Sequence, residues 1–240
     1  MFTKIILEFK STLQYHDELN PVVWDDEKLK KEVRKKFLEI AKFWANYALI
    51  PDKAIKDIVI TGGNANYNYT EYSDLDLHLI VNKDQIADCK DKILDEFLMN
   101  KKALWGLTHD IKIYGIPVEI YAQDISEKPG KSQGVYSVKN DKWVQKPVKE
   151  KVDLNDPLIQ KKVSILAHNI NYFIDSKTND YATLERFKEK LKNMRSSAIK
   201  KGGEFSIENI VFKELRNRKL LDKFTTYILS VEDKNLSLKK

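Results

Sequence analysis

A short apolar segment that ends in two glycines is followed by a polar loop and then by a stretch of alternating apolar and polar residues. Residues 57–61 read Asp-Ile-Val-Ile-Thr, a β-branched composition that favours a strand, and Gly62-Gly63 ends it. In residues 74–81 one face of a strand would carry the leucines at 75, 77 and 79, and the other face would carry Asp74, Asp76 and His78. The pattern predicts a strand, a loop and a strand, with acids on one face of the second strand.

Apolar residues at spacings of three and four predict an amphipathic helix before this pair of strands. The helix would extend over residues 26–49, with Asp25 and Asp26 as caps and Pro51 at its end. After the second strand, a helix is expected to end near Asn100.

Two hairpins are expected next. Residues 110–123 alternate on either side of a turn at residues 115–117, and residues 135–145 turn at Asn140-Asp141. In the first hairpin Glu119 shares a strand face with Tyr121 and Gln123, so it is an acid in the middle of an otherwise apolar strand.

The last third of the chain shows a helical pattern throughout. Helices are expected from Pro157 to about Asp175, from Asn179-Asp180 to Gly202-Gly203, and from Ser206 onward with a break near residue 219. The charged linker at 147–153 predicts a boundary between a domain of residues 1–150 and a helical domain of residues 151–240. The expected fold class is α+β, a small mixed sheet with flanking helices followed by a helical C-terminal domain.

Composition narrows the class of protein. None of the apolar runs approaches the ~20 residues that span a bilayer, and a membrane partner is not expected. Cys89 is the single cysteine, which favours a reducing compartment such as the cytoplasm. The net charge of +6 suits a polyanionic partner such as a nucleotide or RNA. A generally lysine-rich composition, unrelated to any such partner, would explain the same charge equally well.

The acids and the glycines together indicate a chemistry. Two carboxylates on one strand face lie about 6–7 Å apart along the strand, and holding them together without a cation is costly. A glycine pair one strand away lets a phosphate approach backbone N–H groups closely. Carboxylates for Mg²⁺ beside a phosphate cradle are the parts that bind a nucleoside triphosphate.

The run from residue 62 to residue 77, Gly-Gly-x-Ala-x(7)-Ser-Asp-Leu-Asp-Leu, resembles the signature of the DNA polymerase β-like nucleotidyltransferase superfamily. It is similar to the minimal nucleotidyltransferase subgroup and to predicted phage-encoded nucleotidyltransferases. The resemblance implies that Asp74, Asp76 and, as the third acid, Glu119 are the catalytic, metal-binding residues for two Mg²⁺ ions, with Mn²⁺ as a substitute.

The same resemblance implies a reaction. A nucleoside monophosphate would pass from a nucleoside triphosphate such as ATP to an acceptor hydroxyl, and pyrophosphate would leave. The acceptor would be an RNA such as tRNA, a protein or a small molecule. The nucleotide would contact Gly62, Gly63, Asn64 and Ser73, in the cytoplasm of the cell or, for a phage protein, of its host. The alternative is a catalytically degenerate nucleotide-binding or regulatory module on the same fold.

Several positions depart from the family pattern. Gly63 replaces the common Ser, Glu119 replaces the commoner Asp, and Asn66 replaces the Arg of many minimal nucleotidyltransferases. His78 is interpreted as a structural neighbour of the site. The tyrosines of the loop, at 67, 69 and 72, would either stack on a base or pack the loop.

One further segment is open to two interpretations. Gly202-Gly203 is either a simple turn between helices or part of a region in which Lys192 or Arg195 contacts the nucleotide phosphates or the acceptor.

Overall fold

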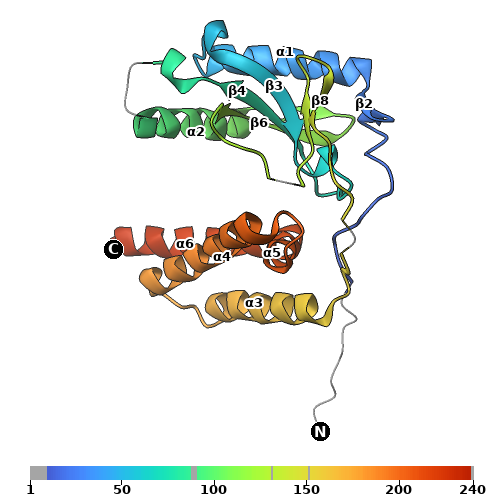
Figure 1. Cartoon of the computed structure of the whole chain (residues 1–240). Helices are drawn as coiled ribbons and strands as arrows, with labels where there is room; N and C mark the ends of the chain where they lie inside the picture. Colours follow the sequence, from blue (N-terminus) through green and yellow to red (C-terminus); the bar gives the residue numbers. More distant parts are fainter. Residues whose placement is uncertain (1–9, 88–90, 131, 151, 239–240) are drawn as a thin grey trace. The chain divides into compact units, whose positions relative to one another are not determined.

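The computed structural model describes residues 10–87, 91–130, 132–150 and 152–238. They divide into two units (Figure 1). The sheet unit spans Tyr15–Lys149, and the helical unit combines the described part of Glu150–Lys240 with residues 10–14. Each unit has its own hydrophobic core.

The sheet unit contains a six-stranded mixed sheet in the order β5-β6-β4-β3-β7-β8 and a separate two-stranded hairpin. Strand β4 (Leu75–Val81) lies between β3 and β6, antiparallel to the first and parallel to the second. The other described elements of this unit are β1 (Trp24–Asp25), β2 (Lys28–Leu29), α1 (Lys31–Tyr47), η1 (Asp52–Ala54), β3 (Ile55–Thr61), η2 (Gly63–Ala65), η3 (Lys83–Gln85), α2 (Asp91–Thr108), β5 (Lys112–Ile113), β6 (Ile116–Asp124), β7 (Val135–Ser137) and β8 (Lys142–Gln145).

The register of β4 against its neighbours determines which side chains meet. Asp76 pairs with Thr61 of β3 and with Glu119 of β6, and His78 pairs with Tyr121. Because directly paired residues point to the same face of a sheet, the acids of two strands that are distant in sequence lie side by side.

The opposite face of β4 packs into the core. Leu75, Leu77 and Leu79 are fully buried together with apolar residues of α1 and α2. This burial fixes the register, since a shift of one residue would turn the leucines outward and the acids inward. The alternation expected from the sequence is therefore the feature that places the acids on the open face.

Two helices differ from the sequence expectation. Helix α1 begins at Lys31 rather than near residue 26, because the chain first forms the hairpin β1–β2. Asp26 takes the left-handed conformation of that turn, with φ 54°, which Asp tolerates better than most residues, so Asp25 and Asp26 are not helix caps. Helix α2 continues past Asn100 to Thr108, with Trp105 buried in its last turn.

The hairpin β5–β6 turns one position earlier than expected. Tyr114 and Gly115 have φ values of 51° and 84°, the pair of positive values that a two-residue type I′ turn requires. The second hairpin turns at Asn140-Asp141, as predicted.

The helical unit contains α3 (Pro157–Asp175), α4 (Tyr181–Gly202), α5 (Ile207–Asn217) and α6 (Leu220–Leu236). Asp156 and Asp180 cap the first two through their side chains, and Gly203 ends α4 with φ 72°. The expected α+β class, a small mixed sheet with flanking helices and a helical C-terminal region, is thus confirmed.

Residues 10–14 join the helical unit through α5. Glu214 accepts hydrogen bonds from Ser11 Oγ at 2.5 Å and from the backbone N–H of Thr12 at 2.9 Å. Cys89 lies outside the described residues. Within the described residues, no helix combines the length and the hydropathy that crossing a bilayer requires.

Candidate metal and nucleotide site

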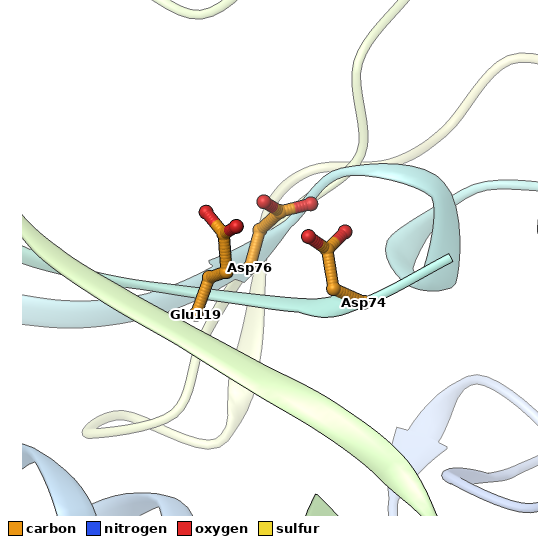
Figure 2. A group of neighbouring side chains, drawn as sticks. All are labelled: Asp74, Asp76 and Glu119. Atoms are coloured by element: carbon orange, nitrogen blue, oxygen red, sulfur yellow. The ribbon is translucent and has the colours of Figure 1, made fainter. Parts of the chain in front are cut away.

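Three carboxylates converge on the open face of the sheet. Asp74 directly precedes β4, Asp76 lies on β4, and Glu119 lies beside Asp76 on β6, and one oxygen of each lies within 4.8 Å of the others (Figure 2). The two aspartates are half-buried and Glu119 is exposed. The three acids named from the sequence are therefore brought together.

The donor set fits a hard divalent cation. Mg²⁺ and Mn²⁺ prefer carboxylate oxygens, and Mg²⁺ is usually bound through one or two carboxylates together with phosphate oxygens and water. Three carboxylates this close to one another repel, and a cation among them relieves the repulsion. Lys102 of α2 supplies one positive charge, since its Nζ lies 2.9 Å from Glu119 Oε2.

Gly62 lies directly against the carboxylate of Asp76. Its φ is 74°, in the region that favours glycine, and a Cβ at this position would lie 1.6 Å from Asp76 Oδ2. A Cβ at Gly63 would lie 3.0 Å from Ser73 Oγ, and the next atoms, Ser73 Cβ and Tyr69 Cα, would lie at the ordinary contact distances of 3.5 and 3.8 Å. A side chain at position 62 would therefore displace the Asp76 carboxylate, whereas position 63 has room for a small one if the Ser73 hydroxyl shifts.

The glycine turn is tied to the start of β4 by Asn64. This side chain is buried, donates to the Asp74 carbonyl oxygen at 2.7 Å, and accepts from Asn20 Nδ2 at 2.7 Å. The backbone carbonyl oxygen of Asn64 accepts from Trp24 Nε1 at 2.6 Å. The Asn64 side chain is thus used within the fold, and a nucleotide contact at this residue would fall to the backbone.

Asn20 and Trp24 were not found by sequence reasoning. They lie before α1, in a segment for which the pattern predicts only helix caps, and neither residue type signals such a role.

Asn66 and Ser73 also have partners inside the loop. The Asn66 amide donates to the Gly62 carbonyl oxygen at 2.5 Å and accepts from the Gly134 N–H at 2.8 Å. Ser73 Oγ accepts from the Thr70 N–H at 2.9 Å. Where many minimal nucleotidyltransferases would carry an Arg, this chain therefore has a buried side chain that shapes the glycine turn.

The tyrosines of the loop divide between packing and exposure. Tyr69 stacks on His16, with ring centroids 3.8 Å apart, and Tyr67 packs against the core beneath the ammonium of Lys149. Tyr72 is exposed. Packing accounts for the first two, and Tyr72 keeps a free ring surface.

His78 continues the row of polar side chains behind the acids. It is buried, its Nδ1 lies 2.7 Å from Gln123 Oε1, and its ring packs on Tyr121 at 4.2 Å. Burial lowers the pKa of His78 to about 4, so the ring is neutral at physiological pH. His78 lies outside the metal-capable group and acts as a structural neighbour of the site.

Lys192 and Arg195 lie on α4 of the helical unit. Lys192 Nζ pairs with Glu189 at 3.0 Å, and the Arg195 guanidinium lies 5.0 Å from the Phe212 ring centroid and bonds to Asn209. The backbone N–H of Gly203 donates to Ile199, which is the bonding of a helix C-terminus. A nucleotide or acceptor contact by Lys192 or Arg195 stays a prediction.

The chain was compared with known proteins. It matches no protein-family model and no curated protein. One similar solved structure is a CdnC:HORMA-deltaN complex of E. coli MS115-1, at 15% identity and a TM-score of 0.24, with 85% of this chain and 68% of that one covered. Another is a STING-associated CdnE c-di-GMP synthase from Capnocytophaga granulosa, at 12% identity and a TM-score of 0.21, with 89% and 88% covered. At these TM-scores the comparisons carry no argument about function, and the assignment of a function comes from the geometry of the site.

Proposed function

We propose that this protein is a metal-dependent nucleotidyltransferase, which transfers a nucleoside monophosphate from a nucleoside triphosphate to an acceptor hydroxyl and releases pyrophosphate. The observation that carries the proposal is the meeting of Asp74, Asp76 and Glu119 within 4.8 Å, directly beside a glycine at which a side chain would displace the Asp76 carboxylate. The sequence resemblance named the same residues in the same roles.

Each part of the site would have a distinct task. The three carboxylates would hold one or two Mg²⁺ ions, which when bound neutralise the triphosphate and stabilise the oxygens that attack and leave. The turn at Gly62-Gly63 would bring backbone N–H groups close to the phosphates, because the first N–H groups of a helical turn have no partner within it. Ser73 would add its hydroxyl.

Glu119 would serve the acceptor side. Its side chain is 51% exposed, which makes it accessible to an incoming hydroxyl. A carboxylate within hydrogen-bond reach of that hydroxyl would take its proton as the oxygen attacks the α-phosphorus. The electron pair of the breaking bond would leave on pyrophosphate.

The test is a transfer assay with each α-labelled nucleoside triphosphate, Mg²⁺, and separate RNA, protein and metabolite fractions. We expect label in one fraction with wild-type protein and none with Asp76→Asn. Asp110→Asn is a matched control, because Asp110 is an exposed acid whose partner is Lys112 and which lies outside the triad. Label in no fraction under either Mg²⁺ or Mn²⁺ would contradict the proposal.

The same samples distinguish an enzyme from a nucleotide-binding module. A module would bind a triphosphate and transfer nothing, and Asp76→Asn would leave its function intact if binding did not need the metal. For the acceptor, an RNA predicts binding that weakens steeply with salt, because several phosphate contacts release counterions.

A further inference from the structure

Lys102 projects from the middle of α2 onto the carboxylate of Glu119. Its Nζ donates to Glu119 Oε2 at 2.9 Å and lies 5.1 Å from the centroid of the Tyr121 ring. A cation on the face of an aromatic ring gains electrostatic attraction in addition to its ion pair. Two partners, rather than one, therefore determine where this ammonium lies.

The ring beneath Lys102 is itself held in place. Tyr121 packs on the buried His78 at 4.2 Å, and His78 is bonded to Gln123 at 2.7 Å. These three side chains form an uncharged wall that extends from the acidic triad along β4 and β6. Only 31% of the Lys102 side chain is exposed, compared with 58% for Lys192, which forms an ordinary surface pair on α4.

The position of Lys102 matters because of the charges around it. An ammonium, that of Lys102, already contacts the Glu119 carboxylate of the triad. A divalent cation held by the same three carboxylates would carry the same sign of charge as Lys102 within a few ångströms of it. The ammonium and the metal ion therefore compete for Glu119.

We propose that Lys102 is a positioning residue that acts as a built-in counter-ion of Glu119 and weakens divalent cation binding at the triad. This inference rests on the proposed function and identifies a residue that regulates how tightly the metal site binds a free cation. The phosphates of a nucleotide carry the negative charge that offsets the ammonium. The site would therefore favour a metal ion that arrives together with a triphosphate over the free ion.

The test measures Mn²⁺ binding to the full-length chain without nucleotide, by the electron paramagnetic resonance signal of free Mn²⁺ at fixed pH and ionic strength. We expect Lys102→Met to bind Mn²⁺ more tightly by a factor on the order of ten, given the repulsion between charges a few ångströms apart near a protein surface. Lys102→Arg should bind as wild type does. An affinity that is unchanged or weaker in Lys102→Met overturns the proposal.

Lys101→Met is the matched control. Lys101 lies on the same helix and its loss removes the same charge, but its Nζ lies over Tyr47 and Phe97 and not on an acid of the triad. Its Mn²⁺ affinity should equal that of wild type. An equal gain in both methionine variants would reduce the effect to net charge and would overturn the specific role of Lys102.

A second measurement separates this role from a structural one. Thermal unfolding without metal should show Lys102→Met below wild type, because the triad has lost its counter-ion, and saturating Mn²⁺ should raise its melting temperature by more than it raises that of wild type. If Lys102 had only a structural role, Lys102→Met would lower the melting temperature by the same amount with and without Mn²⁺. In a Glu119→Gln background, Lys102→Met should change Mn²⁺ affinity much less, because the pair is already broken.

The outcomes also distinguish this inference from the proposed function. Tight Mn²⁺ binding by Lys102→Met without nucleotide transfer by wild type would support the counter-ion and contradict the enzyme. Transfer that Asp76→Asn abolishes, with no effect of Lys102→Met on Mn²⁺ affinity, would contradict the counter-ion alone. Absence of Mn²⁺ binding by every variant would overturn both.

Discussion

A single acid of the helical unit, Glu214, and the three acids of the sheet unit have opposite surroundings. Glu214 of the helical unit is fully buried, and it accepts hydrogen bonds from Ser11 Oγ, from both the N–H and the hydroxyl of Thr12, and from Arg218 Nε at 3.2 Å. The triad of the sheet unit instead holds three carboxylates within 4.8 Å of one another at the open face.

The difference shows how a fold uses a carboxylate. A buried charge is tolerated only when it is paired and hydrogen-bonded, and Glu214 meets both conditions with groups of its own unit. The Glu214 carboxylate therefore stabilises the helical unit by binding residues 11 and 12 to α5. The triad concentrates negative charge at an accessible place, and such a concentration is useful when a cation is to be bound there.

The largest expected effect is on the triad. Asp76→Asn should lower transfer activity by a factor on the order of a thousand, since charge stabilisation by a bound metal ion supplies several kcal/mol. It should not lower the stability of the metal-free protein, because it removes repulsion. Initial transfer rates and urea unfolding without metal provide the two measurements. An Asp76→Asn variant that keeps its activity would contradict the distinction between the triad and Glu214.

Glu214→Ala should show the reverse behaviour. Leaving Arg218 and the Ser11-Thr12 segment without their partner should destabilise the helical unit by about 3 kcal/mol. All four tryptophans lie between residues 24 and 143, so tryptophan fluorescence reports on the sheet unit, whereas circular dichroism at helical wavelengths includes the helical unit. We expect the urea midpoint to fall by circular dichroism and to stay unchanged by fluorescence.

A smaller effect is expected at the glycine beside Asp76. Gly62→Ala places a methyl group against the Asp76 carboxylate in a strained backbone conformation, at a cost of about 2 kcal/mol, and it should lower transfer, though by less than Asp76→Asn, by displacing that carboxylate. Gly63→Ala is the matched control and should retain the fold, with only the Ser73 hydroxyl displaced. Equal losses in both variants would show that the turn, rather than its contact with Asp76, is what matters.

The effect expected to be smallest near neutral pH is the pH dependence of stability that His78 introduces. Its pKa in the folded protein, about 4, lies below the ordinary value of 6.5, so the unfolded chain binds more protons between these pH values. The contribution of His78 is complete above pH 6.5 and is lost as the pH falls towards 4, with a slope of at most about 1.4 kcal/mol per pH unit. Stability measured against pH should fall more steeply for wild type than for His78→Gln in this window, and parallel curves would contradict the prediction.

Much of the sheet and the acids of the site follow from local pattern. Alternation alone places Asp74, Asp76 and His78 opposite the buried leucines, and Glu119 stands out because an acid interrupts an apolar strand. What pattern does not contain is pairing between strands. The grouping of Glu119 with Asp74 and Asp76 came from the resemblance to a family, and the parallel pairing of β4 with β6 is what brings Glu119 beside Asp76.

The missed features all depend on long-range contacts. Lys102 lies beyond the expected end of its helix near residue 100, and no local signal shows that it reaches a strand seventeen residues later in the chain. Glu214 forms an i,i+4 pair with Arg218, which along a sequence is indistinguishable from a solvent-exposed pair. Its burial is decided by residues 11 and 12, at the opposite end of the chain.

That last contact has a consequence for the order of folding. The sheet unit is one continuous segment, Tyr15–Lys149, whose strands can pair as soon as they have been synthesised. The helical unit closes over a separation of 203 residues between Ser11 and Glu214, and contacts distant in sequence form late because of the entropy lost in closing long loops. During synthesis the segment that carries the acids would be assembled first, and residues 10–14 would wait for α5 to emerge before they reach their final place.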